Sequence, residues 1–205
     1  MSFYEKRILP KMVHFACGLK PTMKQREKVV PHAKGHVLEI GIGSGLNLSY
    51  YNKAEVKSLV GIDPSKETWE VNKAKQTDLG FDFKYIQTGA EALPLENHSV
   101  DTVVMTYTLC TIPDTIKAMS EIRRVLKPSG QLLFCEHGKA PDAAVLKWQN
   151  RINPYWQKIG GGCHLNKDIP KLIGENGFKV ADLKTMYIPG WKPLSFNFWG
   201  MAQID

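Results

Sequence analysis

The stretch Val37-Leu38-Glu39-Ile40-Gly41-Ile42-Gly43-Ser44-Gly45-Leu46-Asn47 decides the fold. Its first half is an apolar run typical of a buried strand, and its second half carries glycine at three alternate positions. A strand that ends in Gly-x-Gly lets the backbone turn sharply and approach a ligand, while a following helix offers free N–H groups. We therefore predict a nucleotide-like ligand at this loop, and a helix that begins at about Leu46.

The spacing of the glycines separates this loop from two other nucleotide loops. The dinucleotide fingerprint is Gly-x-Gly-x-x-Gly, but Leu46 stands at its sixth position here. No Gly-Lys-Ser/Thr follows, which excludes a P-loop. Glu39, two residues before Gly41, suits a cationic ligand better than a pyrophosphate. A nicotinamide-dependent oxidoreductase is the alternative enzyme class, and tight NADH binding would support it.

From residue 36 onward, short β-branched runs alternate with amphipathic segments, as in βαβ units on a mostly parallel sheet. This pattern predicts an α/β fold. Strands are expected at residues 36–40, 56–63, 81–89, 100–109, 131–138, 179–188 and 195–204. Later helices are expected at residues 65–80 and 168–178, and from Asp114 as N-cap to a turn at residues 127–130. Only a short loop separates the last two strands, so they should pair antiparallel.

The 205 residues, 43% of them hydrophobic, suit a single domain over 1–205. Charges begin at Glu5 and apolar runs are short, so we expect no membrane-spanning helix or secretory signal, and a cytoplasmic location. Residues 1–34 are expected to form an N-terminal helical lid. Residues 140–167 interrupt the alternation with aromatic residues and glycines, and we expect them to form an acceptor-site insertion.

The net charge of +7 is concentrated near the N-terminus, because residues 1–34 carry eight Lys and Arg against two Asp and Glu. The rest of the chain is nearly balanced and has no basic stripe interleaved with aromatics, so no nucleic-acid partner is expected. A solvated basic face is the first interpretation of residues 1–34. Peripheral contact with an anionic membrane is the second.

The four cysteines are scattered along the chain without any Cys-x-x-Cys pair: Cys17, Cys110, Cys135 and Cys163. This spacing disfavours both a zinc site and a disulfide scaffold, so reduced thiols and no metal are expected. The sequence leaves the oligomeric state open.

Asp63 ends the second expected strand, where its carboxylate can accept hydrogen bonds from two ribose hydroxyls. With this residue the chain resembles the class I S-adenosylmethionine-dependent methyltransferases over residues 36–205. "VLEIGIGSG" (37–45) is similar to their glycine motif and "GIDPS" (61–65) to their acidic motif. "TGAEALPLENHSVDTVV" (88–104) and "EIRRVLKPSGQLLF" (121–134) resemble the adenine loop and the later helix and turn of the ubiquinone-biosynthesis-like branch.

The resemblance implies a Rossmann-like sheet of seven strands in the order 3-2-1-4-5-7-6, with one antiparallel strand near the C-terminus. It also implies S-adenosylmethionine as cofactor and S-adenosylhomocysteine as product. The residues expected to bind the cofactor are Glu39, Gly41, Ile42, Gly43, Gly45, Asn47, Asp63, Pro64, Ser65, Gly89, Ala90, Glu91, Thr106, Tyr107 and Leu109. Gly89 and Ser129 depart from the family pattern, and they favour, as one alternative, a catalytically silent module that only binds the cofactor.

A narrower resemblance concerns the methyl acceptor, which we expect to be a small molecule. "YTLCTIPD" (107–114), "FCEHG" (134–138) and "GGGCHLNKD" (160–168) are similar to segments of small thiol methyltransferases of the endoplasmic reticulum and lipid droplets. Bacterial phospholipid N-methyltransferases have a comparable glycine core. A thiol or lipid-like acceptor is therefore favoured, and a quinone or phenol and a phospholipid amine are the alternatives.

Methyl transfer proceeds by in-line displacement, so the protein mainly aligns the two reactants and a strong base need not be visible. His137 and His164 are the candidate catalytic residues, since histidine titrates near neutral pH; a structural hydrogen bond is the alternative for each. Trp148, Tyr155 and Trp156 are expected either to wall the acceptor pocket or to pack in the core.

Overall fold

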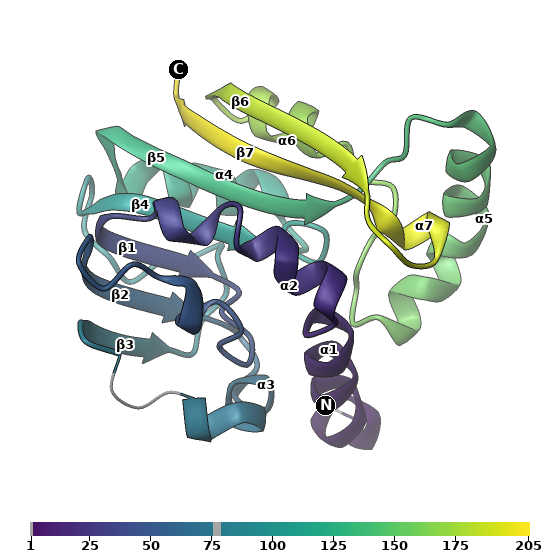
Figure 1. Cartoon of the computed structure of the whole chain (residues 1–205), viewed down its shortest axis with the longest axis horizontal. Coiled ribbons are helices and arrows are strands. Elements are labelled where there is room, and N and C mark those ends of the chain that lie inside the picture. The colour runs from purple at the N-terminus through teal and green to yellow at the C-terminus, as the bar shows by residue number, and fades with distance from the viewer. Residues whose placement is uncertain (1, 76–78) are drawn as a thin grey trace.

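The computed structural model describes residues 2–75 and 79–205. One seven-stranded sheet runs through it, with its strands in the order β3-β2-β1-β4-β5-β7-β6 (Figure 1). The strands are β1 (Gly35–Ile40), β2 (Val56–Ile62), β3 (Asp82–Ile86), β4 (Val100–Thr106), β5 (Leu126–His137), β6 (Phe178–Tyr187) and β7 (Phe196–Ile204). The predicted α/β class and strand order are confirmed.

Strand β7 alone runs against its neighbours, since it pairs antiparallel with both β5 and β6. The strands from β3 to β5 are parallel, and Ile40 of β1 is in register with Ile62 of β2 and Met105 of β4. Strands β1, β2 and β4 therefore end at nearly the same level. The loops that follow them meet at one edge, which is where open parallel sheets bind ligands.

The α-helices are α1 (Leu9–Cys17), α2 (Lys20–Arg26), α3 (Lys66–Trp69), α4 (Thr115–Val125), α5 (Ala143–Ile159), α6 (Ile169–Glu175) and α7 (Lys192–Ser195). Shorter turns are η1 (Tyr4–Ile8), η2 (Val30–His32), η3 (Leu48–Tyr50) and η4 (Glu70–Lys75). The predicted N-cap is confirmed, because the Asp114 side chain accepts a hydrogen bond of 3.0 Å from the Lys117 backbone N–H. None of the described helices is long and apolar enough to cross a membrane.

Two helix predictions were wrong in extent, and a third helix is followed by a strand where a turn was expected. The helix expected from about Leu46 is only the 3₁₀ turn η3, after which the buried Tyr51 side chain turns in beneath the glycine loop and bonds Glu39. The helix expected at 65–80 is interrupted at Asn72, whose backbone is not helical, and its residues 76–78 lie outside the described residues. The helix expected from Asp114 to the turn at 127–130 ends at Val125 as predicted, but β5 begins at Leu126, so residues 127–130 lie in a strand and not in the predicted turn.

Both faces of the sheet carry apolar clusters, because side chains alternate along each strand. Leu38 of β1 belongs to the cluster that includes Met119 of α4 and Ile173 of α6. Val37, the neighbouring residue, belongs to the opposite cluster, which Val30 of η2 helps to form. The segment after α2 therefore closes one face of the sheet and places α1 and α2 near the ends of the strands (Figure 1).

Most of the insertion 140–167 forms α5. Hydrogen bonds of one buried polar side chain, and not the packing of its aromatic residues, hold this helix in place. Buried Gln149 donates hydrogen bonds to the carbonyls of Gly138, Leu165 and Pro193. Trp148 and Tyr155 are exposed, and neither they nor Trp156 are among the described residues that line the cavity at the strand ends. Both predicted roles were therefore wrong for Trp148 and Tyr155, because α5 is held to its neighbours by the buried polar side chain of Gln149.

Candidate functional site

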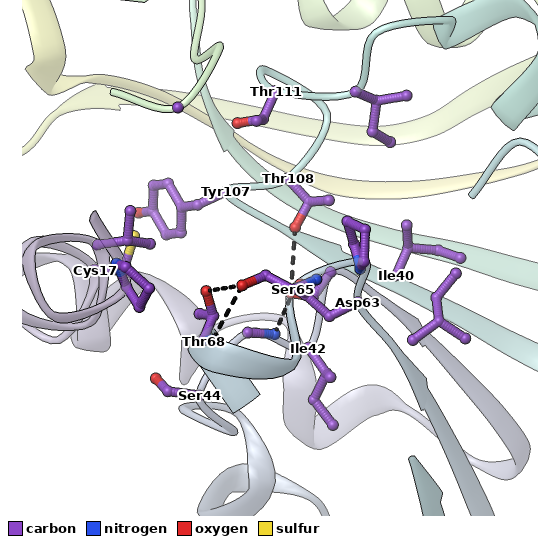
Figure 2. A pocket seen from close by; sticks show the side chains of 18 of the residues that line it. Cys17, Ile40, Ile42, Ser44, Asp63, Ser65, Thr68, Tyr107, Thr108 and Thr111 are labelled. Atoms are coloured by element: carbon purple, nitrogen blue, oxygen red, sulfur yellow. Dashed lines mark hydrogen bonds between the residues drawn. The ribbon is translucent and has the colours of Figure 1, made fainter. Parts of the chain in front are cut away.

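A cavity of about 480 Å³ lies at the carboxyl ends of β1, β2 and β4, between the glycine loop and α1 (Figure 2). The described residues that line it include these members of the predicted cofactor site: Gly41, Ile42, Gly43, Asp63, Pro64, Ser65, Gly89, Ala90, Glu91, Thr106 and Tyr107. Four predicted residues are absent from the described lining: Glu39, Gly45, Asn47 and Leu109. The fold thus gathers residues from four separate segments around one space.

The glycine loop has a conformation that other residues rarely adopt. Gly41, Gly43 and Gly45 have φ of 66°, 55° and 74°, in the left-handed region. A Cβ on Gly41 would lie 2.3 Å from the hydroxyl oxygen of Thr108, and a Cβ on Gly45 would lie 2.7 Å from Leu48. The loop therefore needs glycine both for its turns and for its close contact with the segment after β4.

Asp63 joins the end of β2 to the glycine loop. Its Oδ2 accepts a hydrogen bond of 3.0 Å from the Gly43 backbone N–H, and its Oδ1 accepts one of 2.8 Å from the Ser65 backbone N–H. Partial burial raises the pKa of this carboxyl, and these two hydrogen bonds oppose the rise. Because each oxygen has a second lone pair, the carboxylate can still accept hydroxyl groups from a ligand in the cavity.

Glu39 lies beneath the glycine loop. Its oxygens accept hydrogen bonds from the Asn47 side-chain amide at 2.9 Å and from the Tyr51 hydroxyl at 2.7 Å. Asn47 also donates to the Thr106 hydroxyl at 2.9 Å. Burial raises the pKa of Glu39 to about 7. Glu39 and Asn47 thus support the wall of the cavity through Thr106.

Arg26 of α2 is the principal residue that the sequence did not reveal. It lines the cavity, although its side chain is almost fully buried. Its Nη1 donates to Asn47 Oδ1 at 2.8 Å and to the Thr106 hydroxyl at 2.5 Å, whereas its Nε is buried without a hydrogen-bond partner among the described residues. A guanidinium at a cavity wall suits a carboxylate of the ligand, although the Nε atom itself is buried. The sequence showed Arg26 only as one of many basic residues in 1–34, with no signal that it is buried.

The segment after β4 is positioned by a buried carboxylate. Glu136 at the end of β5 accepts hydrogen bonds from the backbone N–H groups of Thr108 and Leu109, at 2.8 and 3.0 Å. Burial raises the pKa of Glu136 to about 8. Tyr107 has a φ of 55°, and its hydroxyl donates to Asn197 of β7 at 2.6 Å. These contacts turn Tyr107 and Thr108 toward the cavity.

The predicted lid segment does contribute to the cavity. Leu9, Val13, His14 and Cys17 of α1 line it, and the imidazole Nδ1 of His14 lies 2.6 Å from the hydroxyl oxygen of Ser44. His14 is therefore in hydrogen-bond contact with the glycine loop. Sequence reasoning missed it, because nothing in "KMVHFAC" marks which face of this helix docks on the sheet.

The two histidines predicted to be catalytic lie outside the described lining of the cavity. His137 is buried, and its Nε2 lies 3.2 Å from Cys163 Sγ. Its ring stacks on Tyr107 at 6.4 Å between ring centres, so it lies behind a residue of the cavity wall. His164 is half-buried, and its backbone N–H donates to the carbonyl of Cys110. Their catalytic roles stay predictions.

The fold and the cavity together define a Rossmann-like protein whose cofactor site accepts a nucleoside with an attached amino acid. Asp63 and the left-handed glycine loop suit the nucleoside, and the guanidinium of Arg26, which lines the cavity, suits the carboxylate of an amino acid. The residues present therefore fit S-adenosylmethionine, which carries both groups.

Comparisons with known proteins agree with this class. A family model described as "Methyltransferase domain" matches residues 38–134. The thiol S-methyltransferase TMT1B of Rattus norvegicus is 32% identical over 81% of this chain and 69% of its own length, and that of Homo sapiens is 30% identical over 89% and 79%. The crystal structure of an S-adenosylmethionine-dependent methyltransferase from Methanosarcina mazei has a TM-score of 0.66 at 20% identity, over 84% of this chain and 93% of that one.

The chain belongs to the S-adenosylmethionine-dependent methyltransferases. Its cofactor is S-adenosylmethionine, as predicted, and its methyl acceptor is a small molecule. The nicotinamide-dependent alternative is thereby set aside.

Proposed function

We propose that this methyltransferase transfers its methyl group to the sulfur of a small, apolar thiol. The observation that carries the proposal is its similarity to thiol S-methyltransferases over most of their length. Leu9 and Val13 of α1, together with Ile112 after β4, give the cavity an apolar side that suits an uncharged thiol. A thiolate is a good nucleophile, so the reaction needs less help from a base than methylation of a phenol or an amine does.

The cofactor-binding roles follow from the groups that face the cavity. S-adenosylmethionine, when bound, supplies a sulfonium methyl carbon that the acceptor displaces in line. We assign the ribose hydroxyls to the Asp63 carboxylate and the amino-acid carboxylate to the Arg26 guanidinium. Residues 89–91 border the expected adenine position, with Gly89 offering no side chain to the adenine amino group. With both ends of the cofactor held, the protein contributes mainly alignment, which can be worth on the order of 7–11 kcal/mol.

A methyl-transfer screen tests the acceptor. The purified protein is incubated with S-adenosylmethionine labelled in its methyl group and with an alkyl thiol, a quinol, a phenol, a primary amine or phosphatidylethanolamine vesicles. We expect label on the thiol, at a rate well above that on the other acceptors. Label on another acceptor only would overturn the thiol proposal, and cofactor binding without any transfer would favour the silent module.

We also propose that the enzyme acts at an anionic membrane surface. Large apolar side chains in and next to η1 and α1 are exposed: Phe3, Ile8, Met12, Phe15 and Leu19. Two lysines and an arginine lie between them in the sequence, so the segment combines apolar and basic side chains. A lid that docks on lipid would bring apolar acceptors to the cavity beneath it. The cytoplasmic location stays a prediction.

A further inference from the structure

Two cysteines and a histidine that are distant in the sequence meet behind the wall of the methyl-transfer cavity. Cys163 Sγ lies 3.6 Å from Cys110 Sγ and 3.2 Å from His137 Nε2, and all three donor atoms lie within 4.8 Å of one another. Cys110 and His137 are buried and Cys163 is half-buried. We call these three residues the thiol–imidazole cluster.

The fold holds each member of the cluster in place. Cys110 follows the segment that the Glu136 carboxylate fixes, and His137 is the last residue of β5. Cys163 is brought back to them by a tight turn after α5, in which Gly161 and Gly162 have φ of 63° and 87°. The turn is then closed on Cys110, whose carbonyl accepts the backbone N–H of His164 at 3.0 Å.

The geometry of the cluster is close to that of a tetrahedral zinc site. Zn–S bonds of about 2.3 Å and Zn–N bonds of about 2.0–2.1 Å place two sulfurs roughly 3.8 Å apart, and a sulfur and a nitrogen roughly 3.6 Å apart. The observed separations of 3.6 and 3.2 Å need only small adjustments to reach these values. Two thiolates and an imidazole select soft or borderline cations over magnesium and calcium.

We propose that Cys110, His137 and Cys163 bind one Zn²⁺ ion and leave its fourth position open. Three protein ligands with an open position are typical of catalytic rather than structural zinc sites. The spacing of cysteines in the sequence disfavoured a zinc site, but that reasoning considers only local pairs, and here the two cysteines are 53 residues apart.

The position of the cluster gives the open coordination site a use. The ring of His137 stacks on Tyr107, and Cys110 Sγ lies 3.4 Å from the Thr111 hydroxyl; Tyr107 and Thr111 both line the cavity, as do residues 160–161 before Cys163. None of the three ligands lines the cavity, so the acceptor sulfur would reach the metal from the cavity side once the side chain of Tyr107 or Thr111 moves aside. This use rests on the proposed thiol acceptor.

Methyl transfer to a zinc-bound thiol conserves atoms and electrons. The two cysteines release their protons when they bind the ion, and the acceptor thiol releases its own proton to solvent when it takes the fourth position. Its sulfur lone pair then forms the bond to the methyl carbon. The electron pair of the breaking carbon–sulfonium bond stays on the departing sulfur, and the metal keeps its oxidation state.

Metal binding is tested on the untagged full chain, reduced, stripped with a chelator and reconstituted with Zn²⁺. We expect about one zinc per chain by elemental analysis. With Co²⁺ as the probe, we expect a thiolate-to-cobalt charge-transfer band that shows cysteine ligation. A chain that retains no metal and shows no such band would overturn the site. So would a chain in which Cys110 and Cys163 form a disulfide while Zn²⁺ is present under reducing conditions.

Matched variants separate ligation from folding. Cys163→Ser changes a half-buried turn residue, and we expect it to weaken zinc binding by more than the roughly 10–100-fold typical of losing a hydrogen-bond partner of a metal ligand. Cys135→Ser changes a buried thiol of β5 outside the cluster and should keep both the zinc and the cobalt band. Circular dichroism spectra and melting temperatures are measured to check that both variants fold. Equal zinc affinity in the two variants would contradict the proposal.

The use of the metal is tested apart from its binding. We expect zinc removal to lower the turnover number for an alkyl thiol at least about tenfold, while the affinity for S-adenosylhomocysteine is unchanged. Thiol methylation at the same rate without zinc would overturn the activating role and leave the proposed function standing. Zinc binding with no methylation of any thiol would contradict the proposed function and leave the metal site standing.

Discussion

The Gly43 backbone N–H donates a hydrogen bond of 3.0 Å to Asp63 Oδ2, which couples the loop after β1 to the end of β2. The contact lies at the carboxyl edge of the sheet, where it sets the conformation of the loop and the direction of the carboxylate together. A substitution at either residue should therefore lower the affinity for the cofactor.

Asp63→Ala should weaken S-adenosylhomocysteine binding by about 10- to 100-fold. A hydrogen bond to a charged group is worth roughly 1.5–3 kcal/mol, and the variant loses the proposed contacts to the ribose as well as the acceptor for Gly43. Isothermal titration calorimetry measures the change. Asp82→Ala, at an exposed carboxylate that begins β3, is the control and should bind normally. Normal affinity in Asp63→Ala would refute the assigned ribose position.

Arg26→Met should discriminate between two ligands. S-adenosylhomocysteine carries the amino-acid carboxylate, whereas 5′-methylthioadenosine lacks it. We expect the variant to bind S-adenosylhomocysteine at least about tenfold more weakly, because the carboxylate loses a charged hydrogen-bond partner. Binding of 5′-methylthioadenosine should change much less. An equal loss for both ligands would show that Arg26 acts by supporting Asn47 and Thr106 instead.

The strands could be predicted from the sequence because each is a local apolar run, whereas their order was implied by the resemblance to a known family. The helix after the glycine loop could not, since the hydrogen bond between Tyr51 and Glu39 overrides local propensity. Arg26 and His14 were missed for a different reason. Their roles depend on how α1 and α2 dock across the strand ends, and no local pattern encodes that contact.

Gly41→Ala should destabilise the protein by about 1–3 kcal/mol and weaken cofactor binding. The new Cβ would lie 2.3 Å from the Thr108 hydroxyl oxygen at a φ of 66°. Adding Thr108→Ala should restore part of the stability, because it removes the clashing atoms but not the backbone strain. Gly174→Ala in α6 is the control, since no atom lies within 4 Å of its Cβ position. If urea unfolding gives Gly41→Ala and Gly174→Ala the same free energy of unfolding, the close packing of Gly41 against Thr108 would be contradicted.

Glu39 should make the stability of the cofactor-free protein depend on pH. Its pKa rises from 4.5 to about 7 on folding, so its stabilising contribution is complete below pH 4.5 and is lost as the pH rises through 7. The wild type should therefore lose on the order of 3 kcal/mol relative to Glu39→Gln between pH 4.5 and pH 8. Urea unfolding of both proteins at several pH values measures this difference. A difference in unfolding free energy between the two proteins that stays constant with pH would contradict the raised pKa of the buried Glu39 carboxyl.

The exposed apolar side chains near the N-terminus should govern membrane binding. Phe3 and Phe15 are 75% and 71% exposed, and the double variant Phe3→Ser/Phe15→Ser should reduce co-sedimentation with anionic vesicles severalfold. Ile116→Ser, at a side chain that is equally exposed on α4, should bind as the wild type does. Raising the salt concentration should weaken the binding of all three. If the wild-type protein does not co-sediment with anionic vesicles at low salt, the membrane proposal is wrong.

The most direct measurement is a crystal structure of the protein with S-adenosylhomocysteine and an unreactive analogue of the acceptor thiol. We predict the ribose hydroxyls on Asp63, the amino-acid carboxylate on Arg26, and the cofactor sulfur facing the acceptor beside Tyr107 and Thr111. S-adenosylhomocysteine bound elsewhere, or an acceptor on the far side of the glycine loop, would contradict the account.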